Sequence, residues 1–148
     1  MTQPSIEVLG KEDVRKALEA LGSEAEGVLD AAVNLGAMEI RNAAADKAPQ
    51  KTGNLRRSIT ATRSTDSSAL VEYDIGTNLE YAAIHEYGGT IYPRGQFLVF
   101  EIGGETIFAR SVTLEARPYL TPAFDEKKEA AKEVVGQMVA EAMQRVGQ

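Results

Sequence analysis

The residues that could perform chemistry in this chain centre on its one histidine, His85, which is followed by Glu86. A histidine beside a carboxylate is typical of a general base or, with further ligands, of a metal site. The chain contains no cysteine, so disulfides and thiolate ligands are excluded and carboxylates would have to complete any metal site. No ligand spacing supports one. We therefore interpret His85 as a packed or interfacial residue and expect no metal and no cofactor.

The other residue patterns of catalytic sites are missing as well. Ser58 and Ser111 do not lie in the nucleophile-elbow pattern of hydrolases. The glycine pairs Gly88-Gly89 and Gly103-Gly104 lack the Lys and Ser/Thr that complete a phosphate-binding loop. We expect that the protein is not an enzyme. A small hydrolase or binding domain centred on His85 remains an alternative.

The charge of the chain argues against nucleic-acid recognition and its hydropathy against a membrane span. Acidic residues number 22 and basic residues 16, which gives a formal charge of −6. Nucleic-acid binding requires clustered cations, and the one short basic cluster is Arg56-Arg57 with Arg63 nearby. No apolar run is long enough to cross a bilayer, and Met1–Pro4 does not resemble the start of a secretion signal. We expect no membrane association, and contact with DNA only in passing.

The chain length predicts a single domain over residues 1–148, with a helical extension at 1–22 and a core at 23–148. Apolar residues at helical spacing between 14 and 21 predict the first helix. The segment 23–26, Ser-Glu-Ala-Glu, is a capping box that predicts the start of a second, long helix. That helix must end near Ala48, because Pro49 disfavours helical geometry in the residue before it.

The middle of the chain predicts strands. Thr52 and Gly53 form a turn, after which Leu55 and Ile59 are expected to begin a strand. Alternation at 71–75 predicts a second strand, with the turn between them at 66–68. Residues 80–86 predict a short helix closed by the glycine pair at 88–89. A further pair at 103–104 predicts a two-residue β-hairpin between 96–102 and 105–112, because both glycines can adopt positive φ.

The end of the chain predicts a second long helix. Thr121 is the expected N-cap and Pro122 the first helical residue. An apolar stripe from Phe124 to Val146 lies opposite a charged face. The order of elements indicates an α+β fold with a long N-terminal helix, one mostly antiparallel sheet with a β-hairpin, and a C-terminal helix.

Three separated segments carry a resemblance. They read Ala-Pro-Gln-Lys-Thr-Gly-Asn-Leu-Arg-Arg-Ser-Ile at 48–59, Tyr-Ala-Ala-Ile-His-Glu-Tyr-Gly-Gly at 81–89, and Ala-Arg-Pro-Tyr-Leu-Thr-Pro-Ala-Phe at 116–124. In this order they resemble the phage tail-completion and virion-morphogenesis families, which include head–tail joining proteins similar to minor tail protein Z. The family pattern has Asp before Thr-Gly, where this chain has Lys51.

The resemblance implies a structural virion protein, assembled in the host cytoplasm, that forms a homo-oligomeric ring at the head-proximal end of a phage tail. This protein would complete the tail and join it to the head at the neck. A hexamer is the expected order, other neck and tail proteins are the expected partners, and DNA would only pass through the lumen. The alternative is a head-side adaptor or a morphogenesis factor. The candidate structural and interface residues are Pro49, Thr52, Gly53, Leu55, Arg56, Arg57, Tyr81, His85, Gly88, Gly89, Phe97, Phe100, Arg117, Pro118, Leu120 and Pro122.

The predicted hairpin is apolar on both faces. Phe97 and Val99 point to one face, and Leu98, Phe100 and Ile102 to the other. A hairpin with one wet face should alternate apolar with polar residues. The second face therefore needs a cover, and we expect the hairpin to contribute to contacts with a neighbouring subunit. The alternative cover is the two long helices of the same chain.

Overall fold

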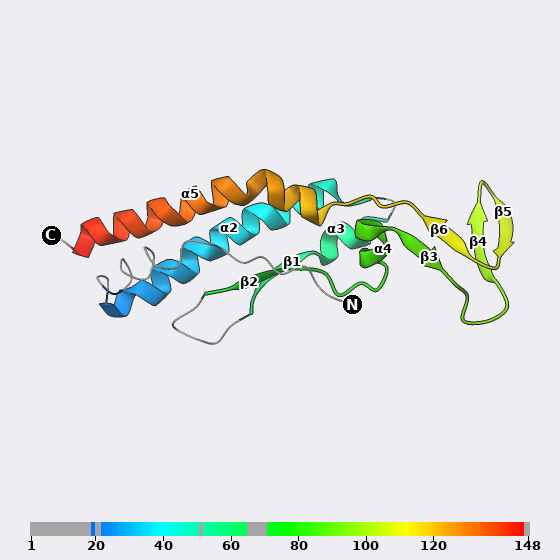
Figure 1. The fold of residues 1–148 in the computed structure, drawn as a ribbon, viewed down its shortest axis with the longest axis horizontal. Helices are drawn as coiled ribbons and strands as arrows, with labels where there is room; N and C mark the ends of the chain where they lie inside the picture. The colour runs from blue at the N-terminus through cyan, green and yellow to red at the C-terminus, as the bar shows by residue number, and fades with distance from the viewer. Residues whose placement is uncertain (1–18, 20–21, 51, 65–70, 147–148) are drawn as a thin grey trace.

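Two long antiparallel helices lie side by side and form the body of the protein (Figure 1). They are α2 (Ala25–Lys47) and α5 (Leu120–Val146). This computed structural model describes residues 19, 22–50, 52–64 and 71–146. The helix predicted between 14 and 21 falls almost wholly outside these residues, as does the turn predicted at 66–68. The predictions of two long helices and of an α+β fold are confirmed.

Helix α2 ends where the sequence predicted but begins differently. Its last residue, Lys47, is followed by Ala48 in extended geometry (φ −63°, ψ 140°), as Pro49 requires. At the other end, a 3₁₀ turn η1 (Gly22–Glu24) precedes the helix, and the N-cap is Glu24, whose side chain makes no capping bond. The predicted capping box is therefore wrong, because the turn moves the N-cap from Ser23 to Glu24.

Small residues bring α2 and α5 close together. Gly36 of α2 is buried, and a Cβ atom placed on it would lie 3.1 Å from the Cβ atom of Ala131 on α5. Ala44 and Ala123 are fully buried in the main core. A second, smaller core joins the far ends of the two helices around Ala25, Val139 and Ala142. The alanine- and glycine-rich face of α2 thus serves close helix packing.

The segment after Pro49 forms a helical turn instead of the predicted strand. Helix α3 (Asn54–Ser58) follows Gly53, which has φ 70°. Leu55 and Ile59 are four residues apart and both buried, because one helical turn points both side chains into the core. The strand β1 (Thr60–Arg63) begins only after them and pairs with β2 (Tyr73–Gly76) in antiparallel register. The prediction that Leu55 begins a strand is therefore wrong.

The described strands form three separate two-stranded ladders instead of one sheet. After helix α4 (Ala82–Tyr87), β3 (Gly89–Ile91) pairs with β6 (Val112–Leu114). Between them lies the hairpin of β4 (Leu98–Ile102) and β5 (Glu105–Ala109). Gly103 and Gly104 have φ 60° and 89° at its turn, which confirms the predicted two-residue hairpin.

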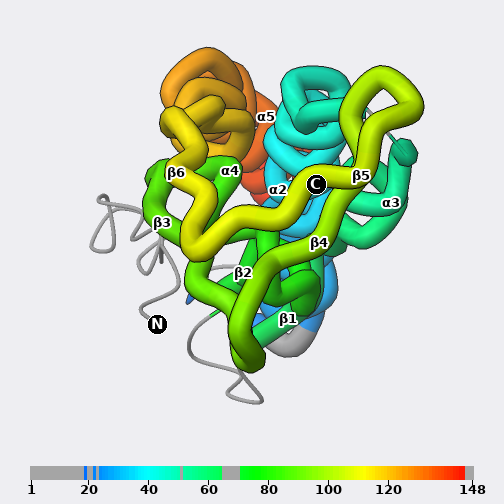
Figure 2. The backbone as a smooth tube through the Cα atoms, turned by 90° about the vertical axis from the view of Figure 1, so that its right-hand side faces the viewer, coloured from blue at the N-terminus to red at the C-terminus, as the bar shows by residue number. Residues whose placement is uncertain are grey.

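Residues 89–114, called the arm below, project from the body. Figure 1 shows β3 and β6 leading away from the helices and the β4–β5 hairpin lying beyond them, turned across the long axis of the molecule. The view along that axis shows the arm in front of the helix pair (Figure 2). The long helices of the same chain therefore do not cover the hairpin.

We predict that Gly36→Leu lowers the free energy of unfolding by about 1–3 kcal/mol, because the new side chain must push α5 away from α2. Thermal or urea unfolding followed by circular dichroism measures this. The matched control is Gly27→Leu on the same helix, where no described atom outside the helix's own backbone lies within 4 Å of the added Cβ. That variant should be as stable as the parent or gain a few tenths of a kcal/mol of helix propensity. Equal losses for the two variants would contradict close packing at Gly36.

Candidate functional site

A buried carboxylate joins α4 to the start of α5. Glu86 is only 6% exposed, and its carboxylate accepts hydrogen bonds from three consecutive backbone amides. Oε2 accepts from the amides of Tyr119 and Leu120 at 2.8 and 2.9 Å, and Oε1 from that of Thr121 at 2.9 Å. The next residue, Pro122, has no amide hydrogen. Together Glu86 and Pro122 account for the donors that the first turn of a helix leaves unbonded.

The predicted cap of α5 is therefore wrong. The helix begins at Leu120, so Thr121 and Pro122 lie within its first turn, and the cap comes from a residue more than thirty positions earlier in the chain. A carboxylate outcompetes a hydroxyl here because it can accept several bonds at once and its charge interacts favourably with the helix N-terminus.

The hydrogen bonds to Glu86 also decide its protonation state. Burial alone would raise the pKa of Glu86, but bonds from the Thr121 side chain and from the amides of Leu120, Tyr119 and Thr121 outweigh it and lower the pKa. Burial raises the pKa of Tyr119 to about 12, with a further contribution from the charge of Glu86. At neutral pH the junction thus contains an ionised carboxylate and a neutral phenol.

Gly88 lets the chain leave α4 close to the segment that precedes α5. It has φ 71° and ψ 178°, a region that residues other than glycine rarely adopt. A Cβ atom here would lie 2.8 Å from the amide nitrogen of Ala116 and 3.0 Å from the carbonyl oxygen of Leu114. Beside it, the amide of Arg117 donates to the carbonyl of His85 at 2.7 Å. The junction therefore brings together two of the three sequence motifs, those at 81–89 and 116–124.

The candidate residues of these two motifs have different surroundings. The His85 ring is half-buried, and its centroid lies 5.8 Å from that of the exposed Tyr81 ring in an edge-to-face arrangement. Leu120 is buried in the core, whereas Arg117 and Pro118 are exposed. Gly89 also has positive φ (152°), but no atom lies within 4 Å of an added Cβ. Within this group, the backbone of His85 and the side chain of Glu86 hold the junction together.

No described residue completes a catalytic pair with His85. The Ser58 hydroxyl donates to the Leu55 carbonyl at 2.8 Å and forms a hydrogen bond with the Thr77 hydroxyl at 2.6 Å. Ser58 therefore connects the end of α3 to the residue that follows β2. Among the residues that the structure describes, no group of three or more His, Asp or Glu side chains could hold a metal ion.

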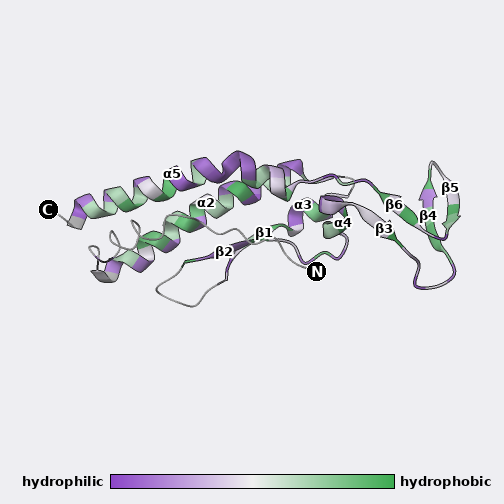
Figure 3. Cartoon of the chain, viewed as in Figure 1, coloured by the Kyte–Doolittle hydropathy of each residue, from purple (hydrophilic) through white to green (hydrophobic). Residues whose placement is uncertain are grey.

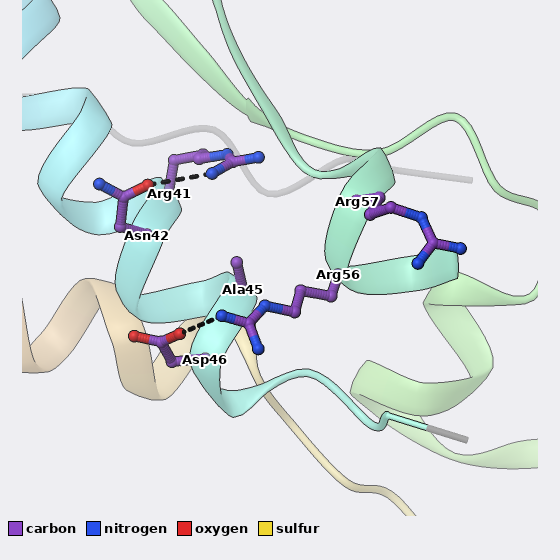
Figure 4. A pocket seen from close by; sticks show the side chains of 6 residues that line it. All are labelled: Arg41, Asn42, Ala45, Asp46, Arg56 and Arg57. Carbon is purple, nitrogen blue, oxygen red and sulfur yellow. Dashed lines mark hydrogen bonds and ion pairs between the residues drawn. The ribbon is translucent and has the colours of Figure 1, made fainter. Parts of the chain in front are cut away.

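Two arginines of the first motif, Arg56 and Arg57, line a small basic depression on the surface together with residues of α2. The depression has a volume of about 320 Å³ and is lined by α2 and α3 (Figure 4). We call it the arginine site; its lining residues are Arg41, Asn42, Ala45, Asp46, Arg56 and Arg57.

Each arginine of the arginine site has one or more partners. Arg41 donates to the Ile59 carbonyl at 2.8 Å, and Arg57 to the Asn54 side chain at 2.6 Å. Arg56 pairs with Asp46 at 3.0 Å, and both of these side chains are exposed. The turn residues Pro49, Thr52 and Gly53 place α3 against the end of α2. The motif therefore adds two arginines to a cationic surface that it shares with α2, and it also forms a turn.

Large apolar side chains are exposed along the arm. Val99 is 61% exposed, Ile102 60% and Phe108 64%. Phe97 is also exposed, and its ring centroid lies 6.4 Å from that of Phe108 in an edge-to-face arrangement. Phe100, on the other face, is half-buried. Figure 3 shows apolar residues along β5 and β6, away from the helix pair. Several large exposed apolar side chains gathered on one hairpin are typical of an interaction site.

Comparison with known families shows to which family the chain belongs. Residues 12–88 match the family described as "Bacteriophage HK97-gp10, putative tail-component", which is more than half of the chain. The chain belongs to this family. Members of the HK97-gp10-like family are phage tail components, so this chain is a structural protein of a phage tail and is located in the virion. Searches of curated proteins and of solved structures found no match.

The HK97-gp10-like match covers the first motif and all but the last residue of the second, and it ends at Gly88, immediately before the arm. It therefore includes α2, α3 and α4, with Glu86 and the arginine site. No helix in the described part of the chain is long and apolar enough to cross a membrane.

Sequence reasoning missed Glu86 and Tyr119, although both lie inside the quoted motifs. Glu86 was considered only as a partner for His85. A charged residue on a short, mostly apolar predicted helix could have indicated a buried carboxylate. The sequence could not show its hydrogen-bond donors, because they lie more than thirty residues away.

We predict that Gly88→Ala lowers the free energy of unfolding by at least about 1–3 kcal/mol, because the backbone conformation and the lack of space both exclude a Cβ atom. Gly89→Ala is the matched control, since its added Cβ has free space and only the backbone opposes it. Thermal melting of both variants checks this. Similar melting of Gly88→Ala and the parent would contradict the described geometry.

We predict that Glu86→Gln costs about 1–3 kcal/mol at neutral pH, because the amide offers one acceptor oxygen to three buried donors. Since folding lowers the pKa of Glu86, its contribution is present above the ordinary pKa of a glutamate, near 4.5, and is lost as the pH falls below it. Urea unfolding between pH 7 and pH 3 should show that the difference in free energy of unfolding between variant and parent becomes smaller as the pH falls. Glu80→Gln, an exposed control, should match the parent. A gap that stays constant down to pH 3 would contradict an ionised Glu86.

Proposed function

We propose that this HK97-gp10-like protein forms a closed homo-oligomeric ring at the head-proximal end of the tail, where it completes the tail and joins it to the head. The observation that supports a multi-subunit assembly is the arm, which exposes apolar side chains on a hairpin that stands away from the body. The three sequence motifs support the tail-completion and head–tail joining role within the wider family.

The arm requires a partner because a two-stranded hairpin is only marginally stable in water by itself. Leu98 and Ala109 face each other across the ladder, as do Phe100 and Ile107, and these four side chains are half-buried against their own hairpin. Val99 and Phe108 form a second pair on the opposite face and are largely exposed. A neighbouring chain would complete this apolar layer.

A ring is favoured because the arm lies at one end of an elongated subunit (Figure 1). A neighbour that receives the arm on its body presents a different surface from the one it contributes, which is a heterologous interface. Such an interface closes into a ring when the rotation between successive subunits adds up to a full turn, and that is the arrangement we propose. Six subunits are the order we propose.

The charge of the protein fits a ring through which DNA passes. A formal charge of −6 disfavours tight retention of phosphates on the surface as a whole. We infer that DNA passes through the lumen without being bound, that other neck and tail proteins are the remaining partners, and that the protein is no enzyme. A head-side adaptor or a morphogenesis factor would use the same arm, and detection of the chain in purified tails separates these roles.

We predict that replacing residues 97–110 with a short Gly-Ser linker leaves a folded body that no longer forms rings. The body should keep its helical circular dichroism, because the α2–α5 packing and the Glu86 junction do not involve the hairpin. Native mass spectrometry gives the subunit number, and addition of the protein to tails that lack it gives the completion activity.

Point variants test the same surface without a deletion. Val99→Ser with Phe108→Ser should weaken assembly, whereas Leu35→Ser with Met143→Ser, which changes exposed apolar residues outside the arm, should not. Rings that survive the linker variant would contradict a role of the hairpin in assembly. A parent chain that is monomeric both alone and on tails would refute the ring itself.

A further inference from the structure

The tip of the arm is acidic. Within β4, β5 and their turn, the only charged residues are Glu101 and Glu105, which give the tip a charge of −2. Glu101 pairs with Thr106 and Glu105 with Ile102, so the two carboxylates lie on opposite faces of the hairpin, one register position apart. Both are exposed, and neither forms an ion pair with another described residue.

The arginine site has the opposite charge. Its three arginines and one aspartate, Asp46, give a net charge of +2. Asp46 and Arg56 form an exposed ion pair, which contributes little stability in water. The Arg56 guanidinium can therefore donate hydrogen bonds to a second carboxylate. Figure 4 shows the Arg56 and Asp46 side chains extending toward each other between α3 and α2, with Arg57 at the outer side of α3. Guanidinium groups bind carboxylates through paired hydrogen bonds.

The tip and the arginine site lie on different parts of one molecule. The β4–β5 hairpin is separated from α3 along the long axis by β3 and β6 (Figure 1). The two surfaces are therefore available to different neighbours.

We propose that the acidic tip of the arm docks into the arginine site of a second copy of this chain. This inference rests on the proposed ring and specifies its heterologous contact. The tip and the arginine site have opposite charges, −2 and +2, and one carboxylate lies on each face of the hairpin, so either face presents a carboxylate to the arginines. Each subunit offers one surface of each kind, so the contact can repeat around an axis. A second copy is favoured over DNA because the chain as a whole carries a formal charge of −6, which opposes the approach of a long polyanion such as DNA.

Crosslinking tests the contact directly, because the chain has no cysteine of its own. Thr106→Cys lies opposite Glu101 at the tip, and Asn42→Cys lies in the arginine site; both positions are exposed. When the two single variants are mixed and oxidised, or treated with a short thiol crosslinker, a mixed dimer should form. The matched control mixes Thr106→Cys with Glu133→Cys, an exposed position on α5, and should stay uncrosslinked. Equal crosslinking in both mixtures would overturn the proposal.

Charge reversal tests the contact a second time. Glu101→Arg with Glu105→Arg, or Arg56→Glu with Arg57→Glu, should each weaken assembly at least about tenfold in native mass spectrometry. A chain with all four substitutions should assemble again, because both charges are reversed together. The control pair Glu133→Arg and Glu141→Arg should have no effect.

The outcomes separate this contact from the proposed function. If the parent forms rings but neither reversal weakens them, or the fourfold variant is not restored, the contact is wrong while the ring stands. If Arg56→Glu with Arg57→Glu lowers the affinity for a DNA fragment and leaves assembly intact, the arginine site serves DNA and the contact is also wrong. If the parent does not assemble under any condition, the proposed ring itself fails.

Discussion

The hydrogen bonds between Glu86 and the first amides of α5 are the interaction on which the described architecture depends. They connect the short helix before the arm to the long helix after it, so that both ends of the arm are held at one place on the body. A buried carboxylate without partners would be costly, but three amides and the helix N-terminus keep this one ionised. At the same junction, Gly88 and the hydrogen bond from the Arg117 amide to the His85 carbonyl hold the end of α4 close to the segment that precedes α5.

This junction divides the protein into a packed body and an exposed arm. The body follows the ordinary rules of a small core, in which Gly36 and the alanines of α2 let α5 approach closely. The arm does not follow these rules, because several of its large apolar side chains are exposed to solvent. Such a division is expected in a structural tail component, whose function is to hold a fixed shape and to present surfaces to its neighbours.

Much of the fold could be predicted from local patterns. The end of α2 at Pro49, the hairpin at Gly103-Gly104 and the apolar stripe of α5 depend only on residues that are close in sequence. Predictions failed where a distant residue competed with a local one. The cap of α5 comes from Glu86 instead of Thr121, and the burial of Leu55 with Ile59 favoured a helical turn over a strand.

For this protein, the sequence by itself determined most of the element types, the positions of most turns and the resemblance to phage tail proteins, because glycine, proline and apolar spacing act over a few residues. Tertiary structure decided which groups meet: Glu86 with the start of α5, and Arg41 with Arg56 and Arg57 in one depression. It also decided that the strands form three separate ladders and that the arm is left uncovered. The physical reason is that hydrogen bonding and charge pairing between distant segments depend on how the helices pack, which local patterns do not specify.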